Sequence, residues 1–347
     1  MRALITGAMG LIGSSVSLAL LRAGWSVTGI DNDGRSAFFG PAGSTVQMLP
    51  QLAKYDRYDH INHDVADEIM LASVVAKLEP DLVVHSAAQP SHDLAAKIPF
   101  LDARTNVLGT LSVLEAVRKS NKCARDTLVI HMSTNKVYGD NPNRVAVVEL
   151  QTRYDYADNR VGIDESMSTV GGVHSLFGVS KLAADAYAVE YGKNFGIRTV
   201  ALRCGCLTGP GHAGVEAHGF MSYIVRCAML GTPYKIYGYK GKQVRDQLHA
   251  SDVSRLVLRL VEQAVVPGSV FNVGGGRKNS ASILETIDMV ELITSKQLHH
   301  EYVDVARVGD HICYITDNAA ITNATGWRPT LCLDTIIADI AEGVSES

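Results

Sequence analysis

The first 31 residues constrain the fold of this chain more than any other stretch. Residues 3–5 form a short apolar run that predicts a β-strand, and an apolar segment of helical length follows as far as Gly24. A second apolar run, residues 25–30, ends at Asp31. Three glycines, Gly7, Gly10 and Gly13, stand where the first strand turns into the helix. This order predicts a strand–helix–strand unit of a parallel α/β sheet.

The spacing of these glycines suits the binding of a pyrophosphate. Glycine lets the backbone approach closely, and a helix N-terminus offers N–H groups to phosphate oxygens. Three glycines can also form a tight turn without a ligand, but the strand, helix, strand and acid around them disfavour that interpretation. Asp31 could accept hydrogen bonds from an adenosine ribose and would repel a 2′-phosphate. The pattern therefore predicts NAD rather than NADP as the cofactor.

Composition limits the other possibilities. A chain of 347 residues can bury a substantial core, and its net charge of −4 leaves no basic field for nucleic acid or an anionic membrane. The six cysteines form no CxxC pair, so we expect reduced thiols and no metal site. No cleavable signal precedes the first strand, and no apolar run reaches the roughly 20 residues of a membrane span. We therefore expect a cytoplasmic protein.

Further apolar runs predict more strands of the same sheet. They cover residues 58–64, 81–88, 127–132, 198–202 and 269–273, and helical spacing marks residues 98–120 and 174–195. His85, inside one of these strands, is expected to be a packed histidine rather than a catalytic one. Residues 140–173 are polar with few periodic apolar positions, which predicts a long loop that is functional or mobile.

This alternation predicts an α/β fold with a doubly wound parallel sheet of the Rossmann type. We expect an NAD-binding domain over residues 1–210, completed by a return segment at about 248–275. Residues 211–247 and 276–347 are expected to form a smaller, discontinuous substrate-binding lobe.

Motifs along nearly the whole chain resemble the extended short-chain dehydrogenase/reductase family of NAD-dependent sugar epimerases and dehydratases. In family order, the glycine motif is followed by Asp64-Val65, Ala87-Ala88, Asn106, Ser133-Thr134, Lys181 and Arg203. Within the family, the runs STNKVYGD at 133–140, HS at 174–175 and GKQVRDQLHA at 241–250 are most similar to the CDP-tyvelose epimerases, also called CDP-paratose 2-epimerases. The resemblance implies NAD as cofactor and a nucleotide-diphosphate sugar, first a CDP-sugar, as substrate.

The resemblance also implies which residues contact the cofactor. Small residues after a buried strand let the dinucleotide lie against the backbone, and an acid at another strand end fits the adenine edge or simply caps a helix. The implied cofactor-binding residues are Gly7, Gly10, Leu11, Ile12, Gly13, Asp31, Asn32, Asp64, Val65, Ala87, Ala88, Gln89, Asn106, Ser133 and Lys181.

The catalytic residues of the family are matched only in part. In the family, a tyrosine four residues before the lysine removes the proton of the sugar hydroxyl, and a Ser or Thr shares that proton. The lysine lowers the phenol pKa, because a phenol with its ordinary pKa of about 10 is a poor base at neutral pH. Thr134 and Lys181 match, but Phe177 occupies the place of the tyrosine. A phenyl ring can neither accept nor donate a proton.

Three explanations of Phe177 stay open: a natural enzyme with another base, a mutant made to trap a ligand, and a homologue that has lost the chemistry. The candidate bases are Cys204, Cys206 and His174, since a thiol beside Lys181 could have a lowered pKa. Free cysteines are, however, often mere packing residues, and His174 stands where relatives suggest a capping role. Tyr154, Tyr156, Asp164 and Glu165 of the long loop are further candidates.

The resemblance assigns the sugar diphosphate to two arginines, Arg245 and Arg307. A guanidinium is a planar fork that binds a phosphate through two hydrogen bonds, which a lysine cannot do. His218 and Phe220 are expected to line the base or sugar pocket, with helix packing an equally good account of Phe220.

The residues after Thr134 favour epimerisation over dehydration. Related 4,6-dehydratases have Asp-Glu directly after the threonine, whereas this chain has Asn135-Lys136. We therefore expect an NAD-dependent epimerase that oxidises the sugar transiently and reduces it from the other face. The alternatives are a non-catalytic NAD-binding sensor or scaffold, or another NAD-dependent sugar oxidoreductase that lacks the tyrosine. The family also implies a homodimer formed by residues 98–120 and 174–195 of each copy.

Overall fold

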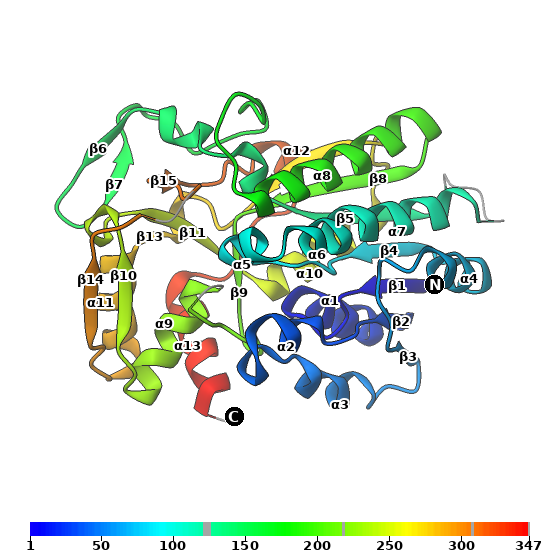
Figure 1. Cartoon of the computed structure of the whole chain (residues 1–347), viewed down its shortest axis with the longest axis horizontal. Helices are drawn as coiled ribbons and strands as arrows, with labels where there is room; N and C mark the ends of the chain where they lie inside the picture. Colours follow the sequence, from blue (N-terminus) through cyan, green and yellow to red (C-terminus); the bar gives the residue numbers. More distant parts are fainter. Residues whose placement is uncertain (121–125, 217–218, 307–308, 346–347) are drawn as a thin grey trace.

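The computed structural model describes residues 1–120, 126–216, 219–306 and 309–345. Within these residues a seven-stranded sheet forms the centre of the molecule, in the order β12-β8-β5-β4-β1-β2-β3, and every pairing in it is parallel (Figure 1). The strands are β1 (Arg2–Thr6), β2 (Ser26–Ile30), β3 (Tyr58–Ile61), β4 (Leu82–His85), β5 (Leu128–Thr134), β8 (Arg198–Cys204) and β12 (Ser269–Val273). The order reverses between β1 and β4, which is where such sheets bind ligands.

Helices cover both faces of this sheet. Alternate residues of β1 point to opposite faces of the sheet. Ala3 and Ile5 pack with α1 (Leu11–Arg22) and α10 (Ala250–Glu262), while Leu4 packs with α4 (Glu68–Leu78) and α7 (Gly109–Arg118). The helices are α1 (Leu11–Arg22), α2 (Gly34–Phe39), α3 (Leu49–Leu52), α4 (Glu68–Leu78), α5 (His92–Lys97), α6 (Pro99–Ala103), α7 (Gly109–Arg118), α8 (Leu176–Phe195), α10 (Ala250–Glu262) and α12 (Ala319–Thr325). The predicted doubly wound sheet is confirmed.

The predicted long helix over residues 98–120 is interrupted. A π-helical segment, Arg104–Leu108, separates α6 from α7. The side chain of Asn106 inside this segment bonds to Gln89, Asp102 and Ser180, and Thr110 donates a hydrogen bond to the Asn106 carbonyl at 2.7 Å. The segment therefore directs a polar side chain into the protein, a type of feature that π-turns often provide.

A second hydrophobic cluster lies at the other end of the molecule, at the left of Figure 1. It is formed by α9 (Phe220–Leu230), α11 (Ile283–Thr294) and α13 (Leu333–Ser345), which pack against small sheets. The strands of these sheets are β9 (Cys206–Thr208), β10 (Tyr234–Tyr237), β11 (Val244–His249), β13 (Ser280–Ser282), β14 (His300–Val303) and β15 (Cys313–Tyr314). The proposed domain boundaries stay a prediction.

The predicted loop over residues 140–173 contains regular structure. Strands β6 (Val147–Glu149) and β7 (Tyr154–Tyr156) pair in it, and Tyr156 and Ile163 are buried against β15. Tyr156 accepts a hydrogen bond from Ile315 N, and Glu165 accepts one from Asn272 N. The sequence pattern missed this structure because the segment folds onto distant residues instead of onto a periodic face of its own.

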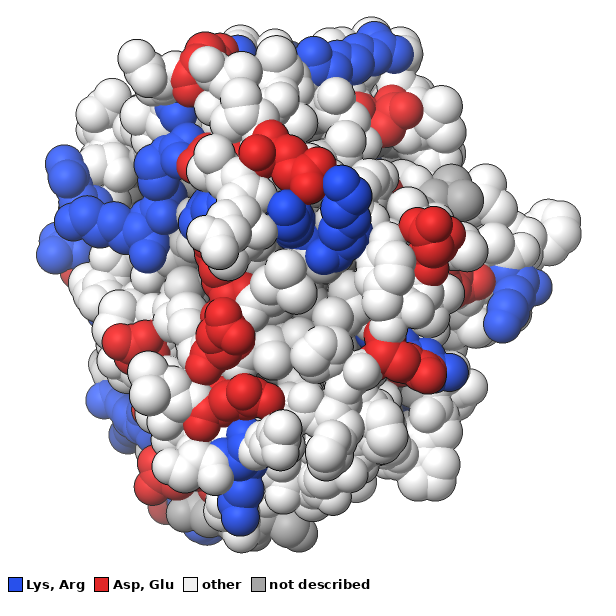
Figure 2. Space-filling model, turned by 90° about the vertical axis from the view of Figure 1, so that its left-hand side faces the viewer, with Lys and Arg blue, Asp and Glu red and all other residues white. Residues whose placement is uncertain are grey.

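Figure 2 faces the end of the molecule that contains β10, β14 and α11, where acidic and basic side chains are interspersed. Lys240 and Lys242 both pair with Glu149, at 3.0 and 2.9 Å, and Lys235 pairs with Glu301 at 3.3 Å.

Across the described ranges, none of the helices combines the length and apolar character that crossing a membrane requires.

Candidate functional site

Two adjoining pockets lie beside the carboxyl ends of β1, β4 and β5. The inner pocket, of about 330 Å³, is lined by Gly7, Gly10, Leu11, Ile12, Gly13, Ala88, Ser133, Thr134, Phe177 and Lys181, among others. The outer pocket, of about 200 Å³, is lined by residues of α9 and β10 together with Arg245 of β11 and Asp310. Six residues line both pockets and mark the junction between them: His92, Asn135, Lys136, Cys206, Gly219 and Phe220.

The glycine turn of the inner pocket tolerates no side chains at two of its positions. Gly7 has φ +68°, and a Cβ added there would lie 2.7 Å from Ala87 N. A Cβ on Gly13 would lie 2.0 Å from Gly7 O. The turn is therefore packed tightly against the strand ends, and it leaves a backbone cradle at the N-terminus of α1 that fits a pyrophosphate.

Asp31 closes this turn from the end of β2. Its carboxylate accepts hydrogen bonds from Met9 N and Asp33 N, both at 2.9 Å. Burial raises the pKa of Asp31, and these two donors oppose that shift. The acid predicted to hold a ribose thus also joins the glycine turn to the start of α2.

Several other predicted cofactor residues do not line the inner pocket. Asp64 pairs with Arg104 at 3.1 Å, and Val65 is buried beside Gly109. Asn32 accepts a hydrogen bond from Gly34 N, and Ala87 packs under Gly7. Their contacts to a cofactor stay a prediction.

Gln89 and Asn106 form a buried network behind the pocket. Gln89 N donates to Asn106 Oδ1 at 2.9 Å, and both side-chain amides donate to Asp102 Oδ1, at 2.7 and 3.0 Å. Gln89 Oε1 accepts from Ser91 N at 2.6 Å. The network fixes the loop between β4 and α5, and this loop leads directly into His92.

The two family-matched catalytic residues lie together in the inner pocket. Lys181 Nζ donates to Met132 O at 2.8 Å, and burial lowers the pKa of Lys181 to about 8. Thr134 ends β5, and its hydroxyl accepts a hydrogen bond from Lys136 N. Phe177 also lines this pocket and is only 7% exposed. The predicted position of the missing tyrosine therefore faces the site.

The other predicted bases have unequal positions. Cys204 and Cys206 both line the inner pocket, but burial raises the pKa of Cys204 to about 12 and that of Cys206 to about 11. Both thiols are therefore protonated at neutral pH. The ring of His174 lies within hydrogen-bond distance of two carbonyls, Gly172 O and Val137 O, and lines neither pocket.

His85 is confirmed as a packed residue. It is 2% exposed, and its ring nitrogens bond to Thr6 Oγ1 at 2.7 Å and Thr110 Oγ1 at 3.0 Å. Burial lowers the pKa of His85 to about 3, and Lys181 adds to that effect.

His92 and Lys136 are site residues that the sequence did not predict. Both line both pockets, and the His92 ring lies 4.9 Å from the ring of Phe177. Nδ1 of His92 bonds to Ser175 Oγ at 2.8 Å. The available signal was their place in the segments that follow β4 and β5, because the carboxyl ends of these strands converge at one edge of the sheet.

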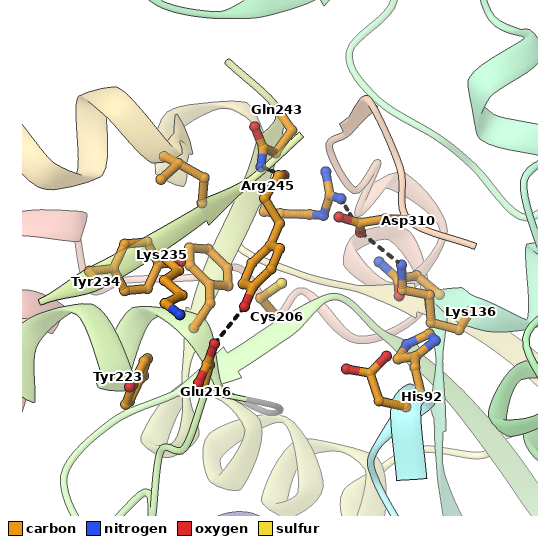
Figure 3. Close-up of a pocket in the computed structure, with 16 residues that line it drawn as sticks. His92, Lys136, Cys206, Glu216, Tyr223, Tyr234, Lys235, Gln243, Arg245 and Asp310 are labelled. Atoms are coloured by element: carbon orange, nitrogen blue, oxygen red, sulfur yellow. Dashed lines mark hydrogen bonds and ion pairs between the residues drawn. The ribbon is translucent and has the colours of Figure 1, made fainter. Parts of the chain in front are cut away.

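The outer pocket combines aromatic and charged groups (Figure 3). Tyr223 and Tyr234 lie with their ring centroids 6.0 Å apart, and the Tyr237 hydroxyl donates to Glu216 at 2.7 Å. Flat aromatic faces of this kind can stack on a nucleobase.

At the other end of the outer pocket, Asp310 lies between two cations, as Figure 3 shows. Its Oδ1 accepts from Arg245 Nη2 and from Lys136 Nζ, the latter at 3.4 Å. Burial alone would raise the pKa of Asp310, but Arg245 and Lys136 hold it well below its usual range. Burial lowers the pKa of Lys136, and Asp310 opposes that shift.

The four predicted substrate residues are only partly placed. Arg245 lines the outer pocket and Phe220 lines both pockets. Arg307 and His218 lie outside the described residues. Across the part of the chain that the structure describes, no three His, Cys, Asp or Glu side chains cluster in a way that could hold a metal ion.

The sequence comparisons agree with this geometry. The model of the NAD dependent epimerase/dehydratase family matches residues 3–274. The chain belongs to this family. It is 33% identical to CDP-paratose 2-epimerase of Salmonella typhi over 335 residues, which cover 95% of each protein. It is also 26% identical to dTDP-glucose 4,6-dehydratase of Shigella flexneri, over 95% of this chain and 88% of that protein.

A solved structure shows a similar fold over the full length. UDP-glucuronic acid 4-epimerase from Bacillus cereus, in complex with UDP-glucuronic acid and NAD, is 26% identical and has a TM-score of 0.81. The alignment covers 100% of this chain and 99% of that one. Membership of this family and the similar structure confirm two expectations: the Rossmann-type fold and NAD as the cofactor.

Proposed function

We propose that this protein is an NAD-dependent epimerase of a nucleotide-diphosphate sugar, with a CDP-hexose 2-epimerase as the first choice. One observation carries the proposal: the pocket that fits a dinucleotide opens into a second pocket lined by aromatic rings and a buried arginine, and six residues line both. A sugar held in the outer pocket could thus present a carbon to the inner one.

The residues of the inner pocket fit the cofactor. Gly7, Gly10 and Gly13 would hold the pyrophosphate, Asp31 the adenosine ribose, and Lys181 the nicotinamide ribose. When bound, NAD would take a hydride from a carbon of the sugar and return it to the opposite face. The Thr134 hydroxyl would hydrogen-bond to the sugar oxygen that becomes a carbonyl.

Arg245 would bind the diphosphate. In the structure its guanidinium donates to Asp310 and to the Val244 and His311 carbonyls, so it is held rigidly at the pocket wall. An anionic diphosphate would replace part of the interaction with Asp310, and Lys136 is positioned to keep that carboxylate neutralised. The tyrosines of α9 and β10 would face the nucleobase.

Two observations favour an epimerase over the alternatives. Dehydration needs an acid and a base after Thr134, and this chain places Asn135 and the Asp310-paired Lys136 there. A sensor that only binds NAD would have no need for a charged second pocket open to the first one.

The helices expected to form a homodimer expose apolar side chains. Phe100 is 92% exposed, and Leu108, Val179 and Tyr187 are exposed on the neighbouring π-segment and α8. The segments α6, Arg104–Leu108 and α8 contact one another, so these side chains belong to one region. We propose that a second copy of this chain covers them.

A panel of nucleotide sugars tests the proposed function. Purified protein with NAD is incubated with CDP-, UDP-, dTDP- and GDP-hexoses, and the sugar stereochemistry is followed by NMR. The proposal predicts an epimer from at least one nucleotide sugar, CDP first, and a loss of activity of at least about 100-fold in Lys181→Met. Unchanged sugars throughout, with NAD bound, would support the sensor instead.

A further inference from the structure

We propose that His92 is the general acid and base that replaces the missing tyrosine. The inference rests on the proposed function and adds to it the group that moves the hydroxyl proton. Phe177 stands where the family has its catalytic phenol, while the structure brings an imidazole from a different segment next to the same ring.

The placement of His92 supports this role. Its ring lies 4.9 Å from that of Phe177 at an interplanar angle of 56°, so the imidazole packs on the ring whose hydroxyl is absent. His92 also lines both pockets, at the junction where a sugar carbon would meet the cofactor. Histidine is the side chain best suited to exchange protons near neutral pH.

The protein fixes the orientation of this ring. Nδ1 of His92 bonds to Ser175 Oγ, which also accepts from Gly178 N as the N-cap of α8. This hydrogen bond can run in either direction, and the proposed role uses the tautomer in which Nδ1–H donates to Ser175 Oγ and Nε2 accepts the proton of the sugar hydroxyl. The loop before His92 is held in turn by Gln89 and Asn106.

Two other residues of the junction are titratable, Lys136 and Cys206, and neither is suited to accept a proton at neutral pH. Lys136 donates to Gly309 O at 3.1 Å and pairs with Asp310, so it is a hydrogen-bonded cation rather than a base. The Cys206 thiol is kept protonated by burial, which raises its pKa to about 11. Of the described residues, the charged and titratable side chains that line the two pockets with His92 include Arg35, Asp93, Lys136, Lys181, Cys204, Cys206, His212, Glu216, Lys235, Arg245 and Asp310. Asp102 and Asp185 lie on the helices that contact α5, namely α6 and α8.

The step balances in both directions. The O–H bond of the sugar alcohol breaks, its proton forms an N–H bond at His92 Nε2, and the hydride lost by the same carbon is the one carried by NAD. Reduction of the ketone from the other face returns the hydride, and Nε2 returns the proton to the oxygen. No further oxidant or reductant is required.

Three variants test the inference: His92→Gln, His92→Gln with Phe177→Tyr, and the surface control His299→Gln. We expect His92→Gln to lower kcat by about 100-fold or more, with KM and NAD affinity within threefold of wild type. The limb of the wild-type pH profile between about pH 5 and 8 should disappear. Adding Phe177→Tyr to His92→Gln should raise kcat at least tenfold above that of His92→Gln alone. The kcat of His299→Gln should equal that of wild type.

Imidazole ¹⁵N NMR supplies a readout that does not depend on turnover. The His92 signal, assigned by its absence in His92→Gln, should shift when the nucleotide sugar is added to the NAD-loaded protein. An unshifted signal, a kcat within threefold of wild type, or a loss that keeps the pH limb and is not restored by Phe177→Tyr would overturn the inference. If the wild type converts no sugar but the His92 signal shifts, the proposed function is refuted. The shift would then still show that His92 lies next to the bound nucleotide sugar.

Discussion

The two halves of the site are built in different ways. The inner pocket depends on backbone geometry within one short stretch, where Gly7 and Gly13 leave no room for a Cβ beside the strand ends. The junction with the outer pocket depends on side chains from separate segments: His92 after β4, Lys136 after β5, Cys206 on β9 and Phe220 on α9. A backbone site is encoded locally, whereas a side-chain site exists only once the sheet has formed.

The substitution with the largest expected effect disrupts the inner pocket alone. Gly13→Ala would drive a Cβ against Gly7 O, and since both groups belong to the packed turn, we expect a loss of about 3 kcal/mol in stability and no measurable NAD binding. Denaturant unfolding and calorimetry measure the two effects. Gly326→Ala is the control, because φ is +70° there and nothing lies within 4 Å, so only about 1 kcal/mol of backbone strain is expected. Equal effects at both positions would contradict the steric account.

The two halves should also respond differently to pH. His85 has its pKa lowered to about 3 in the fold, so between that value and its ordinary 6.5 the unfolded chain binds the extra proton. The contribution of neutral His85 to the free energy of unfolding is therefore fully present above pH 7. It has fallen by about 2 kcal/mol at pH 5. The pKa of Asp310 is also lowered, but from an ordinary value of 3.8, so its contribution is lost only as the pH falls below about 4.

Unfolding measured at pH 7 and pH 5 separates these contributions. We expect His85→Gln to reduce the loss between the two pH values, and Asp310→Asn to leave that loss as it is in wild type. An unchanged loss in His85→Gln, or a reduced one in Asp310→Asn, would show that the buried imidazole is not the source.

A smaller effect concerns cofactor choice. Asp31→Asn keeps the size of the side chain and removes the negative charge that would hold the ribose and repel a 2′-phosphate. We expect NAD affinity to fall about tenfold, with a smaller preference over NADP, in calorimetric titrations. Asp56→Asn, at an exposed position, should leave both affinities unchanged.

The substitution with the smallest expected effect on folding tests the proposed homodimer. Val179→Glu places a charge on the exposed face of α8, so we expect a monomer in light scattering, with folding stability changed by less than about 0.5 kcal/mol. Val266→Glu, also exposed but remote in sequence from these helices, should keep the oligomeric state of wild type. A wild-type monomer would contradict the proposed homodimer.

Local patterns predicted the fold well. The order of strands and helices in residues 1–31 and the apolar runs that follow indicated a parallel doubly wound sheet, and the structure has it. The predictions for residues 98–120 and 140–173 were less accurate. A π-helical segment interrupts the first of these, with Asn106 bonded to Gln89 and Ser180, and in the second β6 and β7 pack against distant elements.

The site shows the same division. Thr134, Phe177 and Lys181 were predicted from the resemblance to the family, and all three line the inner pocket. His92 was missed, because nothing near it in the sequence indicates that it packs on Phe177, 85 positions further along the chain. That contact arises from the meeting of α5 with α8, which only the folded chain reveals.

Labelling from solvent tests the central claim most directly. The epimerisation is run in deuterated water with the nucleotide sugar that the panel identifies, and deuterium at the inverted carbon is measured by NMR. The account predicts inversion without deuterium at that carbon, because the hydrogen leaves and returns as a hydride held by the bound cofactor. Deuterium at the inverted carbon would contradict it, since the hydrogen would then have come from a proton of the solvent.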